Sequence, residues 1–322
     1  MSYISTSAAI REALHIEMEN DPNVYILGED VGFKGGDWGE DKGLFAKFGG
    51  KRTCDTGISE TAIIGHAVGS AAVGLRPIVE IMHMDFQGVC MDEIMNQAAK
   101  MRYMFGGKIS LPMVVRLPAG AGSGAAAQHS QSLEAWVTHI PGLKVVYPSC
   151  AEDALGLMLT AIDDDNPVIF FEGKLLYGMK TEVNSFEPIP LGKGKICREG
   201  GDVSIITYGR QVFDALKAAD KLAADGIEAE VIDLRSLYPL DKELIEQSLS
   251  KTHKAIVLTE EVKRGGYGGE ISAIIAEEMF DYLDAPVARI GALNTPVPFT
   301  PVLEQYYMPN EEDVIVAAKK MF

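Results

Sequence analysis

Four residues in the N-terminal half of the sequence have the types and positions expected of a catalytic cleft. Glu60 opens a helical run of small and apolar residues, ETAIIGHAVGSAAVGL, and Glu29 follows the strand VYIL. Asp92 lies on a largely apolar helix row, and His129 follows a glycine-rich loop in AAAQHSQS. In parallel α/β sheets, ligands gather beyond the carboxyl ends of strands, where Glu29, Glu60 and His129 are predicted to lie. Neighbouring carboxylates push their pKa values apart, which can hold one of them protonated near neutrality.

Each of these residues also has an ordinary structural interpretation, and the residues alone leave both open. The helix dipole favours a carboxylate at a helix N-terminus wherever it points, so Glu60 could be a solvated helix-start charge. Glu29 could accept backbone N–H groups in a turn, and Asp92 could border a solvated face. His129 could be a satisfied structural histidine. Because perturbed acids mark functional sites only statistically, the four positions are hypotheses.

The elements that would position these residues alternate between strands and helices. Strands bounded by helices indicate parallel βαβ units, and therefore an α/β protein with two parallel-sheet domains. In the first half, strands are predicted at 24–27, 77–82, 112–117, 144–148 and 167–172, and helices near 60–74, 86–104, 129–139 and 151–162. In the second half, strands are predicted at DVSIITYG, EAEVIDL, KAIVLTEE and PVARIG, and helices over 211–224, 241–250, 268–282 and from about Glu311.

A stretch rich in Pro, Gly and mixed charge interrupts this alternation at residues 180–202, KTEVNSFEPIPLGKGKICREGGD. Such a stretch is typical of a domain boundary. We therefore predict a first domain over residues 1–185, a linker over 186–201 and a second domain over 202–322. A chain of 322 residues is long enough for two domains with sizeable cores.

Composition narrows the class of protein and its partners. The sequence has no apolar run of transmembrane length and no signal or transit peptide, so we expect a cytoplasmic protein. The net charge of −17 would repel phosphate backbones, which argues against nucleic acid and anionic membranes. A basic protein partner is more natural, although the charge could serve solubility alone. The four cysteines are too widely spread for a zinc site or a disulfide framework: Cys54, Cys90, Cys150 and Cys197.

Two glycine-rich loops suggest a rival function. GSGAAA, residues 122–127, fits the G-x-G-x-x-A pattern of a nicotinamide-dependent reductase, between a predicted strand and a predicted helix. The acid expected at the end of the next strand is missing from Val145, Val146 and Tyr147. GGYGGE, residues 265–270, could cradle an anion or simply form a turn before a helix. A second rival is a non-catalytic scaffold subunit whose acids are only solvated charge.

An ordered set of motifs across the whole chain resembles the β subunit of thiamin-diphosphate-dependent E1 components of 2-oxo acid dehydrogenase complexes. The motifs are LGEDVG, DTGISE, GLRPIVE, NQAAKMRYMFGG, AAAQHSQS, PGLKVV and TPVPFTPVLE. RYMFGGK, AAAQHSQSL, residues 174–180 and TPVPFTPVLE look most like the acetoin dehydrogenase β subunit. Pyruvate and branched-chain β subunits share most of these motifs. Gly57 departs from the family, where many relatives have proline; this loosens the turn before Glu60 but leaves the acid in place.

The resemblance implies a pyrimidine-binding domain followed by a transketolase-type C-terminal domain, and only half of an active site. The β chain of such an E1 holds the aminopyrimidine of thiamin diphosphate, while the α chain holds Mg²⁺ and the diphosphate. This sequence lacks the Gly-Asp-Gly…Asn signature of the diphosphate half. We therefore expect an α₂β₂ heterotetramer, inactive without its α subunit. The enzyme would cleave acetoin, or decarboxylate a 2-oxo acid, and pass the acyl unit to lipoamide of an E2 acyltransferase that docks on residues 202–322.

The resemblance also assigns roles to single residues. Glu60 would face N1′ of the aminopyrimidine, where a carboxyl favours the 4′-imino tautomer that takes the thiazolium C2 proton. Phe86 would pack on the pyrimidine with Met84 beside it, although both could be ordinary core. Glu29 would contact the cofactor site and, with Asp92, form a proton relay. His129 would assist proton transfer and reductive acylation of the lipoyl group.

One further implication of the resemblance is a K⁺ site in the pattern AI.D.NPV. Carbonyl oxygens would hold the ion, which leaves almost no side-chain signature in a sequence. The expected ligands are the carbonyls of Met113, Ala161, Ile162, Asp164 and Asn166.

Overall fold

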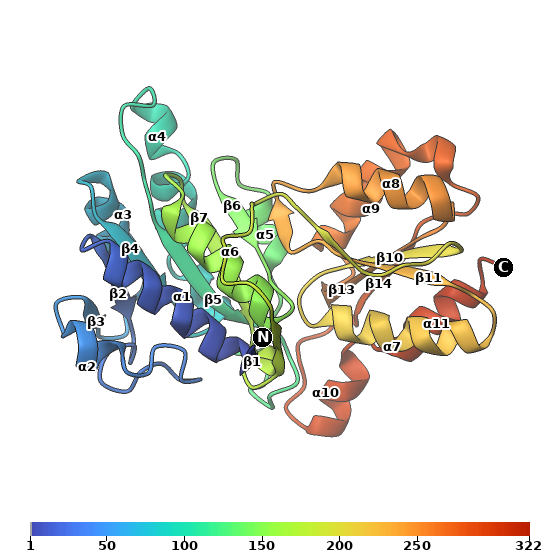
Figure 1. The fold of residues 1–322 in the computed structure, drawn as a ribbon, viewed down its shortest axis with the longest axis horizontal. Coiled ribbons are helices and arrows are strands. Elements are labelled where there is room, and N and C mark those ends of the chain that lie inside the picture. Colours follow the sequence, from blue (N-terminus) through green and yellow to red (C-terminus); the bar gives the residue numbers. More distant parts are fainter. Residues whose placement is uncertain (1) are drawn as a thin grey trace. The chain divides into compact units, whose positions relative to one another are not determined.

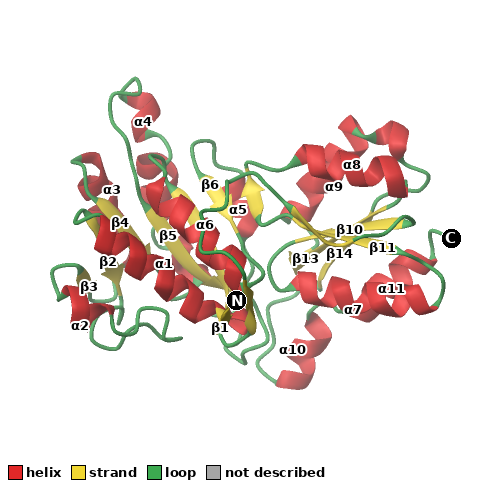
Figure 2. Ribbon diagram, viewed as in Figure 1, coloured by secondary structure: helices red, strands yellow, loops and turns green. Residues whose placement is uncertain are grey.

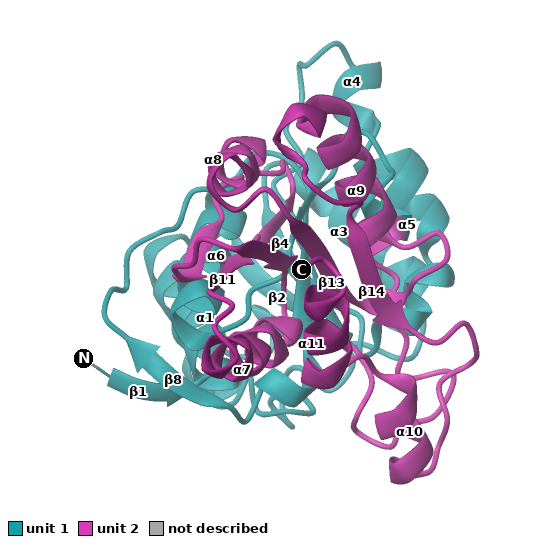
Figure 3. Ribbon diagram, turned by 90° about the vertical axis from the view of Figure 1, so that its right-hand side faces the viewer, with its two compact units in different colours: residues 1–119, 136–191 teal, residues 120–135, 192–322 magenta. Residues whose placement is uncertain are grey.

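The chain divides into two compact units in a computed structural model that describes residues 2–322. The first unit runs to Ala119 and resumes over Trp136–Leu191, and the second unit comprises Gly120–Ala135 and Gly192–Phe322. Figure 3 colours the two units separately. The excursion Gly120–Ala135, which contains His129, therefore groups with the second unit, whereas the sequence placed it in the first domain.

The first unit is built on a parallel sheet whose strands lie in the order β6-β7-β5-β4-β2-β3 (Figure 1). The register places Gly28 beside Glu80, and Glu80 beside Arg116. The carboxyl ends of these strands therefore meet at one edge, as expected of a parallel sheet. The bounds are β2 Val24–Gly28, β3 Thr53–Asp55, β4 Arg76–Glu80, β5 Val114–Ala119, β6 Lys144–Val146 and β7 Val168–Gly173; β1 Ser2–Ser5 pairs antiparallel with β8 Lys180–Val183.

Two long helices bury one core of this unit. Helix α1, Thr6–Asn20, packs against α6, Ala151–Asp163, through fully buried residues such as Ile10, Leu14 and Met158. Figure 1 shows the two helices side by side against the sheet. The other helices of this part of the chain are α2 Leu44–Phe48, α3 Glu60–Ala72, α4 Met101–Met104 and α5 Glu134–Thr138, with a 3₁₀ turn, η3, at Lys174–Leu176.

The long helix predicted over 86–104 is instead three short segments. A 3₁₀ turn, η1, spans Met84–Gly88, a π-helix, η2, spans Glu93–Ala98, and α4 follows. The amide of Ala99 donates to the carbonyl of Ile94, five residues back, which inserts an extra residue into the turn. The apolar period of 3.6 residues that predicted one continuous helix therefore breaks at this point.

The second unit has a sheet in the order β14-β13-β10-β11-β9, parallel except for β9. Figure 2 shows α7 and α11 on one face of the sheet and α8 and α9 on the other. Ala218 of α7 and Val314 of α11 share a buried core with Ile205 and Val231 of the strands. The bounds are β9 Lys195–Arg198, β10 Val203–Thr207, α7 Gln211–Ala224, β11 Ala229–Asp233, β12 Ser236–Tyr238, α8 Lys242–Thr252, β13 Ala255–Val262, α9 Tyr267–Glu278, η4 Phe280–Tyr282, β14 Ala288–Ala292, α10 Pro301–Tyr307 and α11 Glu311–Lys319.

The predicted α/β fold class with two parallel-sheet domains is confirmed. Within the stretch expected to be a linker, residues up to Leu191 group with the first unit and residues from Gly192 with the second. β9 lies inside that stretch as an edge strand of the second sheet. The exact domain bounds stay a prediction. Over residues 2–322, no helix combines the length and the hydropathy needed to cross a membrane.

Candidate active site

Glu60 is the first residue of α3 and is only 8% exposed. The turn before it is fixed by its neighbours: Thr56 N donates to Gly28 O at 2.9 Å, and the Asp55 carboxylate accepts from Gly32 N at 2.6 Å. A buried carboxylate at a helix N-terminus is stabilised by the helix dipole but loses its hydration. A Cβ added at Gly57 would meet no atom within 4 Å, so glycine at this position is not required by close packing.

Glu29 lies one residue beyond β2 and interacts electrostatically with Glu60. Burial raises the pKa of Glu29 above its usual value, and the charge of Glu60 raises this pKa further. Asp30 and Asp37 add smaller contributions of the same sign. The structure thus brings together two of the four predicted acid–base residues. Glu29 therefore holds its proton to a higher pH than an ordinary glutamate does.

A cysteine that sequence reasoning did not assign lies near Glu60. Burial raises the pKa of Cys90 to about 12, and the charge of Glu60 adds to this shift. The segment around Cys90 packs along α3, because Thr61 Oγ1 donates to Val89 O at 2.9 Å. Cys90 therefore stays a neutral thiol and forms part of the apolar wall of the site. Its signal in the sequence was its position on the same apolar row as Phe86.

Met84 and Phe86 both belong to η1, which follows the end of β4. Met84 is fully buried, and the half-buried Phe86 ring meets His83 edge-on with ring centroids 6.1 Å apart. Gln87 is fully buried, yet its amide oxygen and nitrogen have no hydrogen-bond partner among residues 2–322. Buried amides are normally satisfied, so a donor and an acceptor next to Phe86 in sequence fit a polar heteroaromatic ring such as an aminopyrimidine. Sequence reasoning missed Gln87.

Asp92 lies on the surface, in contrast to Glu60. Its side chain is exposed, and its Oδ1 accepts from Asn96 Nδ2 at 2.6 Å. Val89 and Met95, which are close to it in the sequence, are 56% and 38% exposed. The chain by itself therefore does not bring Asp92 into a buried relay with Glu29. That role stays a prediction and requires a second chain to cover this face.

His129 is half-buried in the second unit, within the excursion Gly120–Ala135. Its loop begins with the glycines that suggested a dinucleotide site. Gly122 N donates to Glu304 Oε1 at 2.6 Å, and Gly124 N donates to Glu304 Oε2 at 3.0 Å. The N–H groups that would bind a pyrophosphate are therefore used by a carboxylate of the same chain, which argues against the nicotinamide-dependent reductase.

In the second glycine-rich run, GGYGGE, a backbone N–H group is likewise used by a carboxylate of the same chain. Gly268 N, at the start of α9, donates to Glu261 Oε1 at 3.1 Å. A Cβ at Gly266 would lie 2.6 Å from the Glu261 carboxyl carbon, so glycine is required for this close approach. Burial raises the pKa of Glu261 to about 7 although these backbone donors lower it. GGYGGE is therefore an internal cap and not a cradle for an external anion.

A cluster of buried acids surrounds Arg116 in the first unit. Arg116 Nη1 lies 2.9 Å from Asp41 Oδ1 and 2.9 Å from Glu80 Oε2, and Nε lies 2.6 Å from Glu172 Oε1. Burial raises the pKa of Glu40 to about 7 and raises the pKa values of Asp41 and Glu80, against the opposing effect of Arg116. The single positive charge of Arg116 thus cannot neutralise the negative charges that all these carboxyls would carry when ionised, and some of them retain protons.

The same cluster is the only group of acids in the described part of the chain that could hold a metal ion, through Glu40, Asp41 and Glu80. A metal ion there would lie against the Arg116 guanidinium, which already contacts two of the three carboxylates. This donor set therefore does not fit Mg²⁺. The expectation that Mg²⁺ is held by another chain stays a prediction.

In the predicted K⁺ loop at the end of α6, two carbonyl oxygens already accept hydrogen bonds from an arginine side chain. Arg76 Nη1 donates to Ile162 O at 2.9 Å and to Asp164 O at 3.5 Å. Met113 O accepts from Val168 N at 2.9 Å. A K⁺ ion would have to share two of its five expected carbonyls with a guanidinium. We therefore derive no step through K⁺, and its binding stays a prediction.

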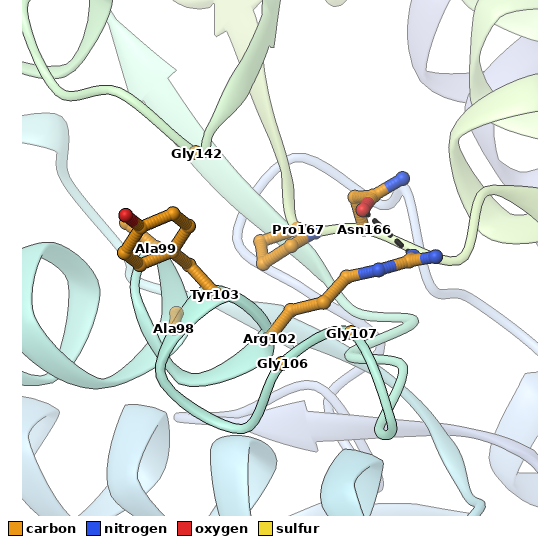
Figure 4. A pocket seen from close by; sticks show the side chains of 9 residues that line it. All are labelled: Ala98, Ala99, Arg102, Tyr103, Gly106, Gly107, Gly142, Asn166 and Pro167. Carbon is orange, nitrogen blue, oxygen red and sulfur yellow. Dashed lines mark hydrogen bonds between the residues drawn. The ribbon is translucent and has the colours of Figure 1, made fainter.

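A surface pocket of about 490 Å³ lies apart from these residues. Figure 4 shows the side chains of Arg102 and Asn166 pointing toward each other, and Arg102 Nη1 donates to Asn166 Oδ1 at 2.8 Å. Gly142 lines the pocket where its backbone crosses Ala99; a Cβ at Gly142 would lie 2.0 Å from Ala99 O. Of the predicted site residues only Asn166 lines it, so this pocket is not the Glu60 site.

The comparisons identify the chain as a transketolase-type protein. Residues 2–180 match the family model of the transketolase pyrimidine binding domain, and residues 192–314 match that of the transketolase C-terminal domain. A solved structure described as a split gene transketolase, inactive beta4 tetramer, superimposes with a TM-score of 0.82 at 27% identity, covering 99% of this chain and 98% of that chain.

The relatives narrow this transketolase-type class to the β subunits of two-chain enzymes. The chain is 50% identical to the acetoin:2,6-dichlorophenolindophenol oxidoreductase subunit beta of Bacillus subtilis (strain 168), covering 97% of this chain and 95% of that one. It is 49% identical to the protein of the same name from Cupriavidus necator, covering 98% and 97%. It is 47% identical to the pyruvate dehydrogenase E1 component subunit beta of Rickettsia felis, covering 99% and 98%. The chain belongs to the thiamin-diphosphate-dependent E1 β-subunit family, which confirms the resemblance.

Proposed function

We propose that this chain is the β subunit of an acetoin dehydrogenase E1, which cleaves acetoin and transfers the acetyl unit to lipoamide of an E2 acyltransferase. The observation that carries the catalytic part is the buried Glu60 carboxyl at the start of α3, which lies close enough to Glu29 to raise the pKa of Glu29. The substrate rests on the two acetoin-named relatives, at 50% and 49% identity against 47% for the pyruvate-named relative. The alternative is a β subunit of a pyruvate or branched-chain 2-oxo acid dehydrogenase E1.

The residues of this chain would hold the aminopyrimidine end of thiamin diphosphate, which supplies the carbanion and the electron sink for the reaction. Glu60 would donate a hydrogen bond to ring nitrogen N1′. Met84 and Phe86 would exclude water from one face of the ring, and the unsatisfied amide of Gln87 would bond to its polar edge. Exclusion of water strengthens each of these polar contacts, because the local dielectric falls.

Glu29 would serve as the proton reservoir for Glu60. Its pKa is raised partly by the charge of Glu60, so protonation of one acid depends on the state of the other. A proton that leaves Glu60 would therefore be replaced from Glu29. Asp92 would extend this relay only after a partner subunit covers the exposed face that it shares with Val89 and Met95.

The remaining parts of the site would come from other chains. An α subunit would supply Mg²⁺ and the diphosphate contacts in an α₂β₂ heterotetramer. His129 would assist proton transfer and acylation of the lipoyl group. The net charge of −17 favours a basic segment on E2, since complementary charge speeds the encounter of partners. K⁺ at the end of α6 stays part of the proposal without a role in catalysis.

The decisive experiment is co-expression of the chain with its α partner, followed by dye-linked turnover of acetoin, pyruvate and branched 2-oxo acids. The chain alone should be inactive, and the complex should reduce 2,6-dichlorophenolindophenol with acetoin when Mg²⁺ and thiamin diphosphate are present. Glu60→Gln should lower kcat by about 10²- to 10⁴-fold, the usual contribution of a positioned acid–base group. Glu243→Gln is the matched control, because Glu243 is an exposed acid in the first turn of α8.

The results of these assays distinguish the candidate functions. Turnover of pyruvate without turnover of acetoin would replace the substrate and keep the family mechanism. Unchanged activity of the Glu60→Gln complex would remove the catalytic role of Glu60 and favour a scaffold subunit.

A further inference from the structure

The loop that carries His129 is closed on itself, and its glycine-rich turn is tied to a buried acid. Gly120 N donates to Gln131 O at 3.2 Å, which joins the two ends of the loop. Near its tip, the amides of Gly122 and Gly124 both donate to the carboxylate of Glu304. Glu304 lies on α10 and is 2% exposed. Glu304, about 180 residues further along the chain, therefore fixes the position of the glycine-rich turn.

Glycine is needed for this arrangement at both positions. Gly122 has a φ of 98° and Gly124 a φ of 70°, in the left-handed region that other residues rarely adopt. This backbone turns two N–H groups toward one point, which makes an anion-binding concavity. The Glu304 carboxylate fills it with charge-assisted hydrogen bonds, which are about twice as strong as neutral ones.

Two neighbouring acids on β13 hold the same excursion at other points. Glu260 Oε1 accepts from Ala121 N at 2.8 Å, and a Cβ at Gly120 would lie 2.6 Å from that oxygen. At the far end, the backbone of Ala135 donates to Glu261. Consecutive strand residues point to opposite faces, so these two acids reach different ends of the excursion. Of the three acids, Glu304 is the one that binds the turn nearest to His129 in the chain.

We propose that Glu304 is the positioning residue for His129. The inference rests on the proposed function, in which His129 transfers protons. The turn held by Glu304 ends two residues before Ala126, which has a φ of 61°. The carbonyl of Ala126 accepts from His129 N at 3.4 Å, so the backbone after the turn sets the direction of the chain at His129. Glu304 acts only through this backbone. Release of its two hydrogen bonds would let the turn relax and move the imidazole.

The test uses the α₂β₂ complex with Glu304→Gln. Glutamine keeps the size of glutamate but replaces one acceptor oxygen with an N–H₂ group, which cannot accept from Gly124 N. We expect faster amide hydrogen exchange over residues 120–131 and a loss of kcat of up to about 100-fold, the effect of misplacing a catalytic group by about 1 Å. Asp241→Asn is the matched control, because Asp241 is also a buried acid of the second unit that accepts from backbone amides, those of Gly194 and Leu244.

A double-mutant cycle separates positioning from general damage. In a His129→Ala complex, Glu304→Gln should cause no further loss of kcat, because the group that it positions is gone. A further loss equal to that in the wild type, or unchanged exchange over residues 120–131, would overturn the proposal. Full activity of His129→Ala would instead refute the role of His129 in the proposed function, and the exchange result would then decide the role of Glu304. If Glu304→Gln fails to assemble, Glu304→Asp replaces it with the same expectations.

Discussion

Glu40→Gln should make the stability of the chain less dependent on pH. Glu40 is fully buried, its Oε2 accepts from Trp38 N at 2.9 Å, and its Oε1 has no hydrogen-bond partner in the described chain. Burial raises its pKa from 4.5 to about 7, against the opposing charge of Arg116. A raised carboxyl pKa means that the folded state binds the proton more tightly than the unfolded state. Its contribution to stability is therefore complete below about pH 4.5 and is lost as the pH rises through about 7.

The magnitude follows from the size of the shift. A shift of one pKa unit corresponds to about 1.4 kcal/mol, so a shift from 4.5 to about 7 corresponds to about 3 kcal/mol of stability lost between pH 4.5 and pH 8. The pKa values of Asp41, Glu80 and Glu40 depend on one another, so this loss of stability belongs to the whole cluster. About 3 kcal/mol is therefore the largest share that Glu40 alone can account for. Glutamine does not titrate, and any cost of its extra N–H₂ group is the same at both pH values.

Urea unfolding of the chain at pH 5 and pH 8 measures this difference. The free energy of unfolding of the wild type should fall between the two pH values by about 2–3 kcal/mol more than that of Glu40→Gln. Glu243→Gln, at an exposed position, should retain the wild-type pH dependence. Equal pH dependence of Glu40→Gln and the wild type would refute the assignment of a shared, buried proton to this cluster.

Two further substitutions test features that hold the first unit together. Arg116→Met should lower the free energy of unfolding at pH 7 by about 3–5 kcal/mol, because it leaves buried carboxylates without a counter-charge. Its cost in urea unfolding should shrink at pH 5, where protonation replaces the guanidinium, and a cost independent of pH would contradict this explanation. Gly142→Ala should cost more than about 2 kcal/mol, because a φ of 107° and an added Cβ only 2.0 Å from Ala99 O both oppose it. Gly57→Ala, with no atom within 4 Å of the added Cβ, should change the midpoint of thermal unfolding little, and equal effects of the two substitutions would contradict the steric argument.

Most strands of the two sheets and most of the long helices were predictable because their signals are local. The predicted helix over 211–224 coincides with α7, and each strand predicted from an apolar run lies within about two residues of an observed strand. Helix α1 was not predicted, although its signal was present: Ser5 caps its first turn, and Ile10 and Leu14 lie on one face. The helix predicted over 86–104 was wrong as a continuous helix, because a single π-turn shifts the period without changing the type of residues.

Glu60 shows how far the sequence reached into the site. Its position at a helix start, behind a turn and before small residues, follows from the sequence alone, and so does its membership of an ordered family pattern. Its burial and its effect on Glu29 and Cys90 required the fold. Gln87 gave no signal, because an unsatisfied amide is recognised only when its surroundings are known.

The sequence by itself determined the alternation of strands and helices, the excess of acids and the family to which the chain belongs. Only the tertiary structure decided what those acids do. The amides of the two glycine-rich runs are taken by Glu304 and Glu261, and Arg116 gathers acids from distant parts of the chain. The physical reason is that backbone donors and long-range charges have no local pattern. A carboxylate in a sequence is only an acceptor, and its partner is chosen when the chain folds.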